Sequence, residues 1–377
     1  MDVAAPAGRL ELVGLKLTPI RLRLRSPLKM SIATVPEREC VLVEAQTAEG
    51  ITGLGESVLA PYFTGENVTG AMRAISRSLA PALIGRDIFD LAGAAVAMDR
   101  VLYGNQAAKS AVETALHDAA ARALGIPLHQ LLGGRVRDGV PATWHVVGSS
   151  PEEVAEECQH GLAMGFRAIK LKVGSLSVAA DLERLDSVRR IVGDDVEIRP
   201  DANQAWALAD AARFLAGARD HRLQFVEQPL HRDDLAGMAH LASGTQTPIA
   251  PDEGVFGAEG ALAYIRAGAA GGFVPKLIKA GGIGGVRRLA AVADAAHLAL
   301  HLAGMPGESS VCAAAAVHLG VALPNLAWGG GISPHAIEHD LVRGPLQLID
   351  GAYLPPAGAG LGVDLDPRLV ARARLEI

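Results

Sequence analysis

Acidic and basic residues recur at one spacing through the second half of this 377-residue chain. Asp201, Glu227, Asp252 and Lys276 follow one another at intervals of 26, 25 and 24 residues. One strand, one helix and two loops take about that many residues, so each charge occupies the same position in a repeated strand–helix unit. In a parallel (β/α) barrel that position is the C-terminal rim, where the active sites of this fold lie. The spacing therefore predicts that the four side chains meet at one site.

Three converging carboxylates would repel one another, so the sequence predicts a cation between Asp201, Glu227 and Asp252. Oxygen ligands suit a hard ion that keeps water or substrate oxygens in its other positions, so Mg²⁺ is expected, with Mn²⁺ as an alternative. No His or Cys shares the spacing of these acids, which argues against zinc. A salt bridge or a helix N-cap would explain any one acid alone, but three acids at the same position in successive units favour a metal site.

Three lysines accompany the acids. Lys170 and Lys172 lie two apart on a predicted strand, so both point to the same side, into the barrel mouth. Lys276 is expected across the opening. A lysine beside a dication and a second ammonium group favours its neutral form and can act as a base near pH 7. Lysines on two sides of a bound carbon, with a metal to hold the developing charge, suit abstraction of a proton α to a carboxylate through an enediolate. An exposed edge strand is the alternative explanation for Lys170 and Lys172.

The elements that must position these residues form two patterns. The first part reads as α+β, with a strand over 10–24, a hairpin of 40–46 and 51–57, and helices near 68–83, 89–101 and 105–124. From about residue 138, short apolar runs alternate with Ala-rich helices that begin near residues 151, 178, 206, 232, 258, 283 and 309. These strand–helix units predict an α/β fold: a closed TIM-like barrel over 137–335. We expect 1–136 to form an α+β capping domain, to which 336–377 return.

Composition excludes several classes of function. Half of the residues are apolar, the net charge is −6, and no long basic run is present, so nucleic acid is not an expected partner. No stretch approaches the ~18 apolar residues that span a bilayer, and the N-terminal 20 residues make a poor signal peptide. The three cysteines are far apart in sequence, which disfavours a disulfide framework and suits a reducing cytoplasm. We therefore expect a cytoplasmic enzyme with a small-molecule substrate.

Taken together, the motifs resemble those of the enolase superfamily and, within it, the muconate lactonizing enzyme (muconate cycloisomerase) subgroup. They are Lys-x-Lys at 170–172, Asp-Ala-Asn at 201–203, Glu-Gln-Pro at 227–229, Asp-Glu at 252–253, Lys-x-x-Lys-x-Gly-Gly from 276, Leu-Leu-Gly-Gly at 131–134 and Gly-Leu-Gly at 360–362. The resemblance implies a (β/α)₇β barrel under a capping domain, with the three acids as Mg²⁺ ligands. It also implies Lys172 and Lys276 as the acid/base pair, with Lys170 tuning Lys172 and touching the substrate carboxylate.

The same resemblance implies further site residues. Asn203 and Glu253 would adjoin the metal or the lysines. Glu308 would lie on the substrate-carboxylate side, although an acid at a helix N-terminus is an alternative explanation. Specificity would come from two loops of the cap, 26–34 and 58–66, and the expected substrate contacts are Lys29, Tyr62, Phe63, His145 and Trp328. The glycine run 281–285 alone would suggest a phosphate-binding loop, but it also fits the turn after the sixth strand of this family.

The expected function is a Mg²⁺-dependent isomerase similar to muconate cycloisomerase. A racemase or epimerase of an amino-acid derivative and a dehydratase of a small hydroxy acid are alternatives, and a barrel that binds a carboxylate without turnover is a remote one. The segment LAWGGGISPH lacks the Asp-x-Asp that the resembled dipeptide epimerases carry after the eighth strand, which favours the cycloisomerases. The resemblance also implies a homo-oligomer, a dimer or an octamer.

Overall fold

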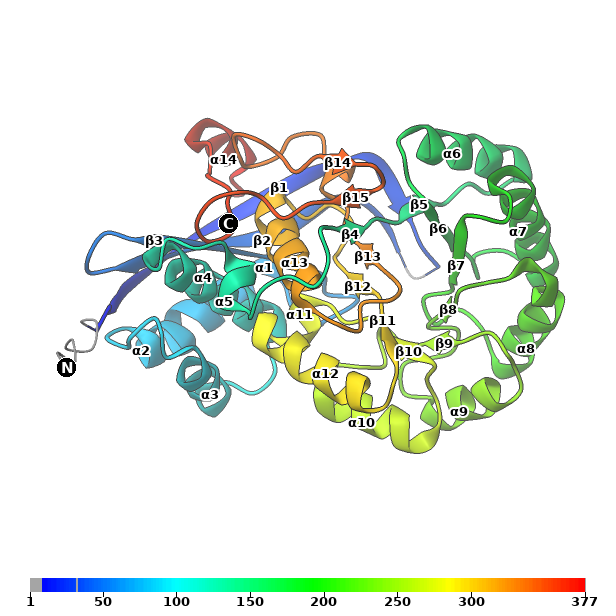
Figure 1. Cartoon of the computed structure of the whole chain (residues 1–377), viewed down its shortest axis with the longest axis horizontal. Coiled ribbons are helices and arrows are strands. Elements are labelled where there is room, and N and C mark those ends of the chain that lie inside the picture. Colours follow the sequence, from blue (N-terminus) through cyan, green and yellow to red (C-terminus); the bar gives the residue numbers. More distant parts are fainter. Residues whose placement is uncertain (1–8, 32, 377) are drawn as a thin grey trace.

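The computed structural model describes residues 9–31 and 33–376. Two predictions fall partly outside the described residues. They concern the N-terminal 20 residues, of which 1–8 are not described, and the loop 26–34, of which residue 32 is not described. Two parts lie side by side along the long axis of the molecule: a twisted sheet with helices packed on it, and a barrel ringed by helices (Figure 1). Among the described helices, none has the length and apolarity needed to cross a membrane.

The first part is built on an antiparallel sheet in the order β1-β2-β3. Its strands are β1 (Leu12–Lys29), β2 (Thr34–Thr47) and β3 (Thr52–Leu59), and a tight turn at 48–50 joins the last two. The helices that follow are α1 (Val68–Ala74), the π-helical turn η1 (Ile75–Leu79), α2 (Ala80–Leu83), α3 (Leu91–Val101), α4 (Gln106–Ala123) and α5 (Leu128–Leu131). The predicted hairpin and the three predicted helical stretches are thus present.

The second part is a (β/α)₇β barrel, the predicted fold class. Five parallel strands form one sheet in sequence order: β5 (Trp144–Val146), β6 (Ala168–Lys172), β7 (Glu197–Asp201), β8 (Val226–Glu227) and β9 (Ile249–Ala250). The ring continues through β10 (Gly272–Phe273) with β11 (Ala299–Leu300), and β12 (Leu302–Ala303) with β13 (Gly330–Gly331). A parallel bridge from Gly330 to Ala142, just before β5, closes it.

Helices cover the outside of the barrel. The crossover helices are α6 (Pro151–Ala163), α7 (Val178–Val192), α8 (Leu208–Gly217), α9 (Leu235–Ser243), α10 (Ala258–Ala267), α12 (Ile283–Ala295) and α13 (Ser310–Ala322). Two short turns, η2 (Arg219–His221) and α11 (Leu277–Ala280), lie in the connections. Each crossover helix begins within three residues of its predicted start. Because β6 lies between β5 and β7, the edge-strand explanation for Lys170 and Lys172 is wrong.

The C-terminal segment contacts both parts. It holds η3 (Pro334–Ala336), β14 (Leu348–Ile349), β15 (Ala352–Tyr353) and α14 (Pro367–Ala373). β15 pairs with β4 (Val140–Pro141), at the entrance to the barrel. The backbone N–H groups of Leu361 and Leu375 donate to the Asp118 carboxylate and the Pro19 carbonyl, on the capping side. The division of the chain at residues 136 and 336 therefore stays a prediction.

A buried carboxylate joins the two parts. Glu113 of α4 accepts hydrogen bonds from the backbone N–H groups of Ile283 and Gly284, both at 2.8 Å, where α12 begins. A helix N-terminus favours an anion at this place. Here the anion is a side chain of the chain itself, so the phosphate-binding explanation of the glycine run 281–285 is wrong.

Candidate active site

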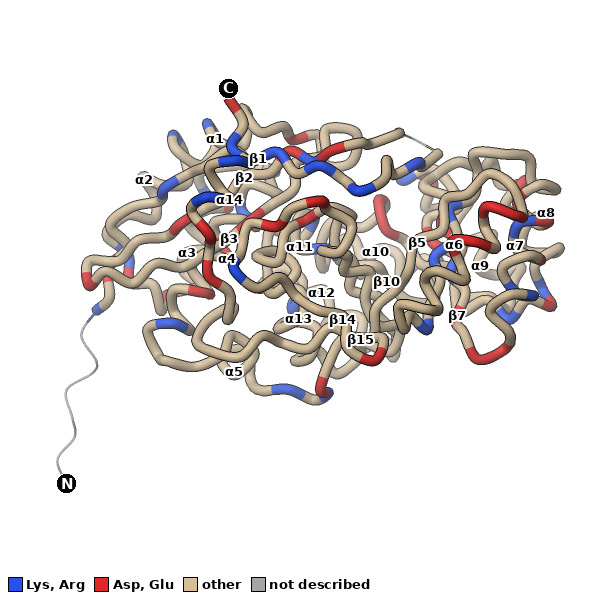
Figure 2. Tube along the Cα trace, turned by 90° about the horizontal axis from the view of Figure 1, so that it is seen from above, with Lys and Arg blue, Asp and Glu red and all other residues tan. Residues whose placement is uncertain are grey.

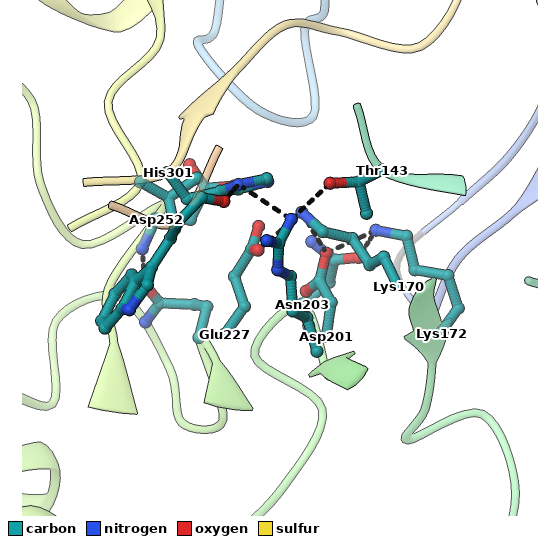
Figure 3. A network of polar contacts seen from close by, with 12 residues as sticks. Thr143, Lys170, Lys172, Asp201, Asn203, Glu227, Asp252 and His301 are labelled. Carbon is teal, nitrogen blue, oxygen red and sulfur yellow. Dashed lines mark hydrogen bonds and ion pairs between the residues drawn. The ribbon is translucent and has the colours of Figure 1, made fainter. Parts of the chain in front are cut away.

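The register of three neighbouring strands assembles the first half of the site. Lys172 of β6 pairs with Asp201 of β7, and Asp201 pairs with Glu227 of β8. Asp252 follows β9 by two residues, and Lys276 stands at the start of α11 directly after β10. All five side chains come from the C-terminal ends of parallel strands, and Figure 3 shows the acids and Lys172 close together at this rim.

Each acid contacts at least one ammonium group. Lys170 Nζ lies 2.6 Å from Glu227 Oε2, and Lys172 Nζ lies 2.6 Å from Asp201 Oδ2. Asp252 pairs with Lys276 on one oxygen and with Lys279, at 2.6 Å, on the other. In this arrangement the acids alternate with lysines. Within the described residues, no three Asp, Glu, His or Cys side chains form a preformed metal-binding site.

The charge balance of the rim nevertheless fits a divalent cation. Glu227 is fully buried, and among the described residues its Oε1 atom has no hydrogen-bond partner. Burial, together with Asp201 and Asp252, raises the pKa of Glu227 to about 8, despite the neighbouring Lys170. A buried carboxylate with a free oxygen beside two other carboxylates is short of positive charge. Hard oxygen ligands of this kind suit Mg²⁺.

Lys276, across the barrel mouth, was expected to be a neutral amine, but its surroundings favour the protonated form. Burial alone would lower the pKa of Lys276, but Asp252, Glu227 and Glu253 raise it above its usual value. The expectation assumed a dication beside the lysine, whereas in this arrangement carboxylates face it. Lys276 is therefore held as an ammonium ion here, and its Nζ lies 4.5 Å from the centre of the Phe63 ring.

The two polar groups predicted beside the metal contact each other. Asn203 accepts from Lys172 Nζ through Oδ1 at 2.8 Å and donates from Nδ2 to Glu253 Oε1 at 3.0 Å. Asn203 therefore links the lysine of β6 to the acid that follows Asp252. It also turns the chain sharply, with φ of 42°.

A narrow cavity lies between the cap and the barrel rim. The cap contributes Met30, Arg38, Tyr62 and Phe63, and the barrel contributes His145, Lys170, Lys172, Asp201, Asn203, Glu227, Lys276, Ala303, Gly304, Met305, Pro306 and Gly331. Burial, with Lys170 and Lys172 nearby, lowers the pKa of His145 well below its usual value, so its ring is neutral. Three of the predicted substrate contacts, Tyr62, Phe63 and His145, thus face this cavity.

Two other predicted contacts, Lys29 and Trp328, do not line it. Lys29 is exposed, because the alternation of β1 turns Leu28 inward and Lys29 outward. Trp328 precedes β13, so it lies at the opposite end of the barrel strands, where its ring packs 4.5 Å from that of Phe225. Because of this strand geometry, the structure does not place Lys29 or Trp328 at the cavity.

Glu308 occupies a small adjoining hollow behind Lys276 and Met305, beside Cys312. Burial raises the pKa of Glu308 to about 7. Its Oε2 accepts weakly from the Met305 N–H, at 3.3 Å, and its Oε1 has no partner among the described residues. A role toward the substrate carboxylate stays a prediction for this residue.

Sequence reasoning assigned no site role to three charged residues, although Lys279 belongs to one of the quoted motifs. Lys279 Nζ holds Asp252 and also donates to the Val274 carbonyl at 2.9 Å. Arg199 is in register with Lys170 and lies one layer deeper in the barrel than Asp201. It contacts Thr143 and His301, and Figure 3 shows these two residues beside the rim. Arg38 reaches the cavity from the cap.

Each of the three carried a signal in the sequence. Lys279 stands one helical turn after Lys276, Arg199 is two residues before Asp201 on the same strand face, and Arg38 shares the inward phase of Cys40 and Leu42.

The barrel carries alternating acids and lysines at its C-terminal rim, beneath an α+β cap. This combination of fold and site is typical of capped-barrel enzymes that carry out acid–base chemistry. The family model of the mandelate racemase / muconate lactonizing enzyme N-terminal domain matches residues 13–133, and that of the enolase C-terminal domain-like family matches residues 153–369. The chain belongs to the enolase superfamily, in its muconate lactonizing enzyme subgroup, and is an isomerase of that superfamily.

Relatives with different reactions are similar to the chain. The L-Ala-D/L-Glu epimerase of Bacillus subtilis is 33% identical over 94% of this chain and 97% of its own. The muconate lactonizing enzyme of Pseudomonas fluorescens, solved with muconolactone, superimposes with a TM-score of 0.94 at 32% identity, over 98% and 100% of the two chains. The N-succinyl Arg/Lys racemase of Bacillus cereus gives 0.93 at 30%, over 97% and 98%. Enzymes of this superfamily generally use Mg²⁺.

Proposed function

We propose that this protein is a Mg²⁺-dependent isomerase that abstracts or delivers a proton α to a carboxylate, through an enediolate, most like muconate cycloisomerase. One observation carries the proposal: Lys172 and Lys276 line the same buried cavity from opposite sides of the ring. β6 is the second strand of the barrel and β10 is the sixth of eight, so the lysines enter half a turn apart. A carbon held between them presents one face to each amine.

The proposed roles follow from the contacts of each side chain. Asp201, Glu227 and Asp252 would hold the metal. When bound, Mg²⁺ would supply the positive charge that binds the substrate carboxylate and stabilises the charge developed on it. Lys172, oriented by Asn203, takes or returns the α-proton on one face, and Lys276 does so on the other. Lys170 holds Glu227 and lies 3.9 Å from Asp201, so its ammonium group adds positive charge beneath the substrate carboxylate.

A racemase or epimerase of an N-substituted amino acid is the second candidate, and the two-sided placement of the lysines favours it. Racemisation requires proton removal from one face and delivery to the other. The segment 328–335 offers no carboxylate to hold a free substrate ammonium group. This disfavours a dipeptide with a free amine, and it leaves a muconate-like acid or an N-acyl amino acid as the substrate.

The partner in this proposal is a small carboxylate rather than a polymer. Figure 2 shows Lys and Arg interspersed with Asp and Glu over both parts of the molecule, a distribution that does not suggest a phosphate-backbone surface. A cytoplasmic location and a dimeric or octameric assembly stay predictions.

Exchange of α-protons with solvent tests the proposal. The protein is incubated in D₂O with muconolactone, N-succinyl amino acids and dipeptides, and the α-hydrogen signals are followed by NMR with Mg²⁺, after EDTA, and after Mg²⁺ is restored. We expect exchange with at least one compound, its loss on chelation and its recovery. Lys16→Ala, at an exposed lysine of β1, serves as the control and should exchange normally. Binding without exchange for every compound, or exchange that persists in EDTA, would contradict the proposal.

A further inference from the structure

The cavity contains one cation that the proposed chemistry does not use. Arg38 of β2 is 2% exposed and lines the cavity from the cap side. Its Nε donates to the Pro306 carbonyl at 2.7 Å, and its Nη1 donates to the Tyr62 hydroxyl. Its Nη2 is buried and has no hydrogen-bond partner among the described residues. Among the described residues, no carboxylate forms an ion pair with the Arg38 guanidinium group either.

This arrangement is costly unless a ligand completes it. A buried guanidinium group without a counter-charge loses hydration that two hydrogen bonds to neutral groups only partly replace, and buried unpaired N–H groups are rare in folded proteins. The fold also keeps space for it. Gly307 adopts φ of +95°, and a Cβ there would lie 2.8 Å from Arg38 Cγ and 2.4 Å from Leu24 Cδ2. The turn before α13 is therefore shaped around the Arg38 side chain.

Arg38 and Tyr62 both line the cavity, and together they keep two donor groups without a partner among the described residues. The Tyr62 hydroxyl accepts from Arg38 Nη1, so its own proton remains available. Arg38 Nη2–H is the second free donor. Paired donors beside a fixed positive charge match the two oxygens of a carboxylate better than a single neutral carbonyl.

Arg38 differs from the other cations that line the cavity. Lys170, Lys172 and Lys276 each pair with an acid of the rim, namely Glu227, Asp201 and Asp252, whereas Arg38 has no acidic partner among the described residues. The acids and the lysines belong to the barrel rim. Arg38 stands apart from them, on the cap side, where the part of a substrate distant from the reacting carbon would lie.

We propose that Arg38, with Tyr62, binds a second carboxylate at the far end of the substrate, so that the enzyme selects dicarboxylates. This inference rests on the proposed function for the placement of the first carboxylate at the rim. It makes Arg38 a specificity-determining residue of the cap, outside the two loops 26–34 and 58–66.

Matched ligands that differ in one terminal group test the inference. One pair is cis,cis-muconate and the hexa-2,4-dienoate of the same double-bond geometry, and the other is an N-succinyl and an N-butanoyl amino acid. Binding to the wild-type protein with Mg²⁺ is measured by calorimetry. We expect the dicarboxylate of at least one pair to bind at least tenfold more tightly than its partner.

Variants then assign the preference to this residue. Arg38→Met should bring the ratio of the two dissociation constants close to one, Arg38→Lys should retain part of it, and Tyr62→Phe should lower it to a smaller extent. The latter two keep the inference testable if the Met variant fails to fold. Arg21→Met, at a half-exposed arginine of β1 in the same sheet, is the matched control and should leave the ratio unchanged.

Two outcomes would overturn the inference: no preference for the dicarboxylate in either pair, including the case in which neither member binds, or a preference that survives in Arg38→Met. These outcomes are separable from a failure of the proposed function. A preference that depends on Arg38 in a protein without α-proton exchange would leave the inference standing and the isomerase proposal contradicted. α-Proton exchange in a protein that binds both members of each pair equally well would do the reverse.

Discussion

At the scale of single residues, the acids of the rim differ in how well their charge is compensated. Asp252 contacts two ammonium groups, and although burial opposes it, Lys276 and Lys279 lower its pKa. Glu227 contacts one ammonium group and keeps an unpaired oxygen, and burial raises its pKa to about 8. A dication bound at the rim would therefore stabilise the negative charge of Glu227 more than that of Asp252.

The first prediction concerns this acid. Glu227→Gln keeps the shape of the side chain but removes its charge, so we expect Mn²⁺ to bind at least about tenfold more weakly. Titration of Mn²⁺ followed by electron paramagnetic resonance, with Mg²⁺ as a competitor, measures the change. Glu44→Gln, at an acid of β2 that pairs with Lys16, is the matched control. An unchanged affinity in Glu227→Gln would remove this residue from the metal ligands.

Residues fixed by their place in a repeated unit were predictable, and residues fixed by packing between distant segments were not. The acids and lysines of the rim fall at strand ends, which the spacing alone reveals. Arg38 gave a local signal, since it shares the inward phase of Cys40, but the sequence does not say what covers that face of β2. Trp328 was misplaced because the start of β13 could not be read from a run of glycines.

At the scale of elements, the closest approach in the cap is that of β3 to α4. Gly53 and Gly55 of β3 face this helix, and a Cβ at Gly55 would lie 2.0 Å from the Ala111 carbonyl oxygen. The alanines of α4 and the glycines of β3 thus let helix and strand backbones meet. The hairpin and the helix were each predictable from local turns and periodicity, whereas their contact joins residues 56 positions apart.

The second prediction follows from this contact. Gly55→Ala forces a methyl group against helix backbone that cannot move aside, and we expect the free energy of unfolding to fall by about 1–3 kcal/mol. Urea unfolding followed by circular dichroism measures it. Gly14→Ala, on β1 of the same sheet, is the control, because its Cβ would meet only the end of the flexible Gln46 side chain, at 3.3 Å. Equal stability of the two variants would show that β3 and α4 are not in tight contact.

At the scale of the whole molecule, the proposed active site depends on the joint between cap and barrel. The cavity takes residues from both parts, and Glu113 ties α4 to the start of α12. His117, 3.3 Å from Glu113, completes this joint. Burial alone would lower the pKa of His117, but Glu113 raises it above its usual value, and His117 in turn helps to lower the pKa of Glu113.

The third prediction is a pH dependence of stability at this joint. A raised pKa of His117 stabilises the fold fully below the pKa of the unfolded state, near ~6.5, and the contribution is lost as pH rises through the folded value. The contribution of Glu113 is present above ~4.3 and is lost as pH falls through its lowered value. The pair should therefore stabilise most between about pH 5 and 6.5.

Urea unfolding at pH 5.5 and pH 9 checks this window. His117→Asn should lose more stability relative to the wild-type protein at pH 5.5 than at pH 9. The exposed His339, changed to Asn, is the control and should show no such difference. A loss in His117→Asn that is the same at both pH values would mean that the ion pair does not form.

The overall architecture was readable because seven strand–helix units leave few alternatives to a barrel. The path of the C-terminal segment was only partly readable. Its contacts with β1 and α4 agree with a return to the cap, but β15 pairs with β4 at the barrel entrance. Such pairing depends on which edge strand is free, and a Gly- and Pro-rich sequence carries little information about that.

If one amine serves each face of the reacting carbon, exchange resolved by face will separate the roles of Lys172 and Lys276. The compound that exchanges with the wild-type protein is incubated in D₂O with Mg²⁺ and Lys172→Gln or Lys276→Gln, and NMR follows its α-hydrogens separately by face or by enantiomer. We expect each variant to lose about 10²- to 10⁴-fold in exchange rate on one face, and the affected face to differ between the two variants. Loss on the same face in both variants, or full exchange in either, would contradict it.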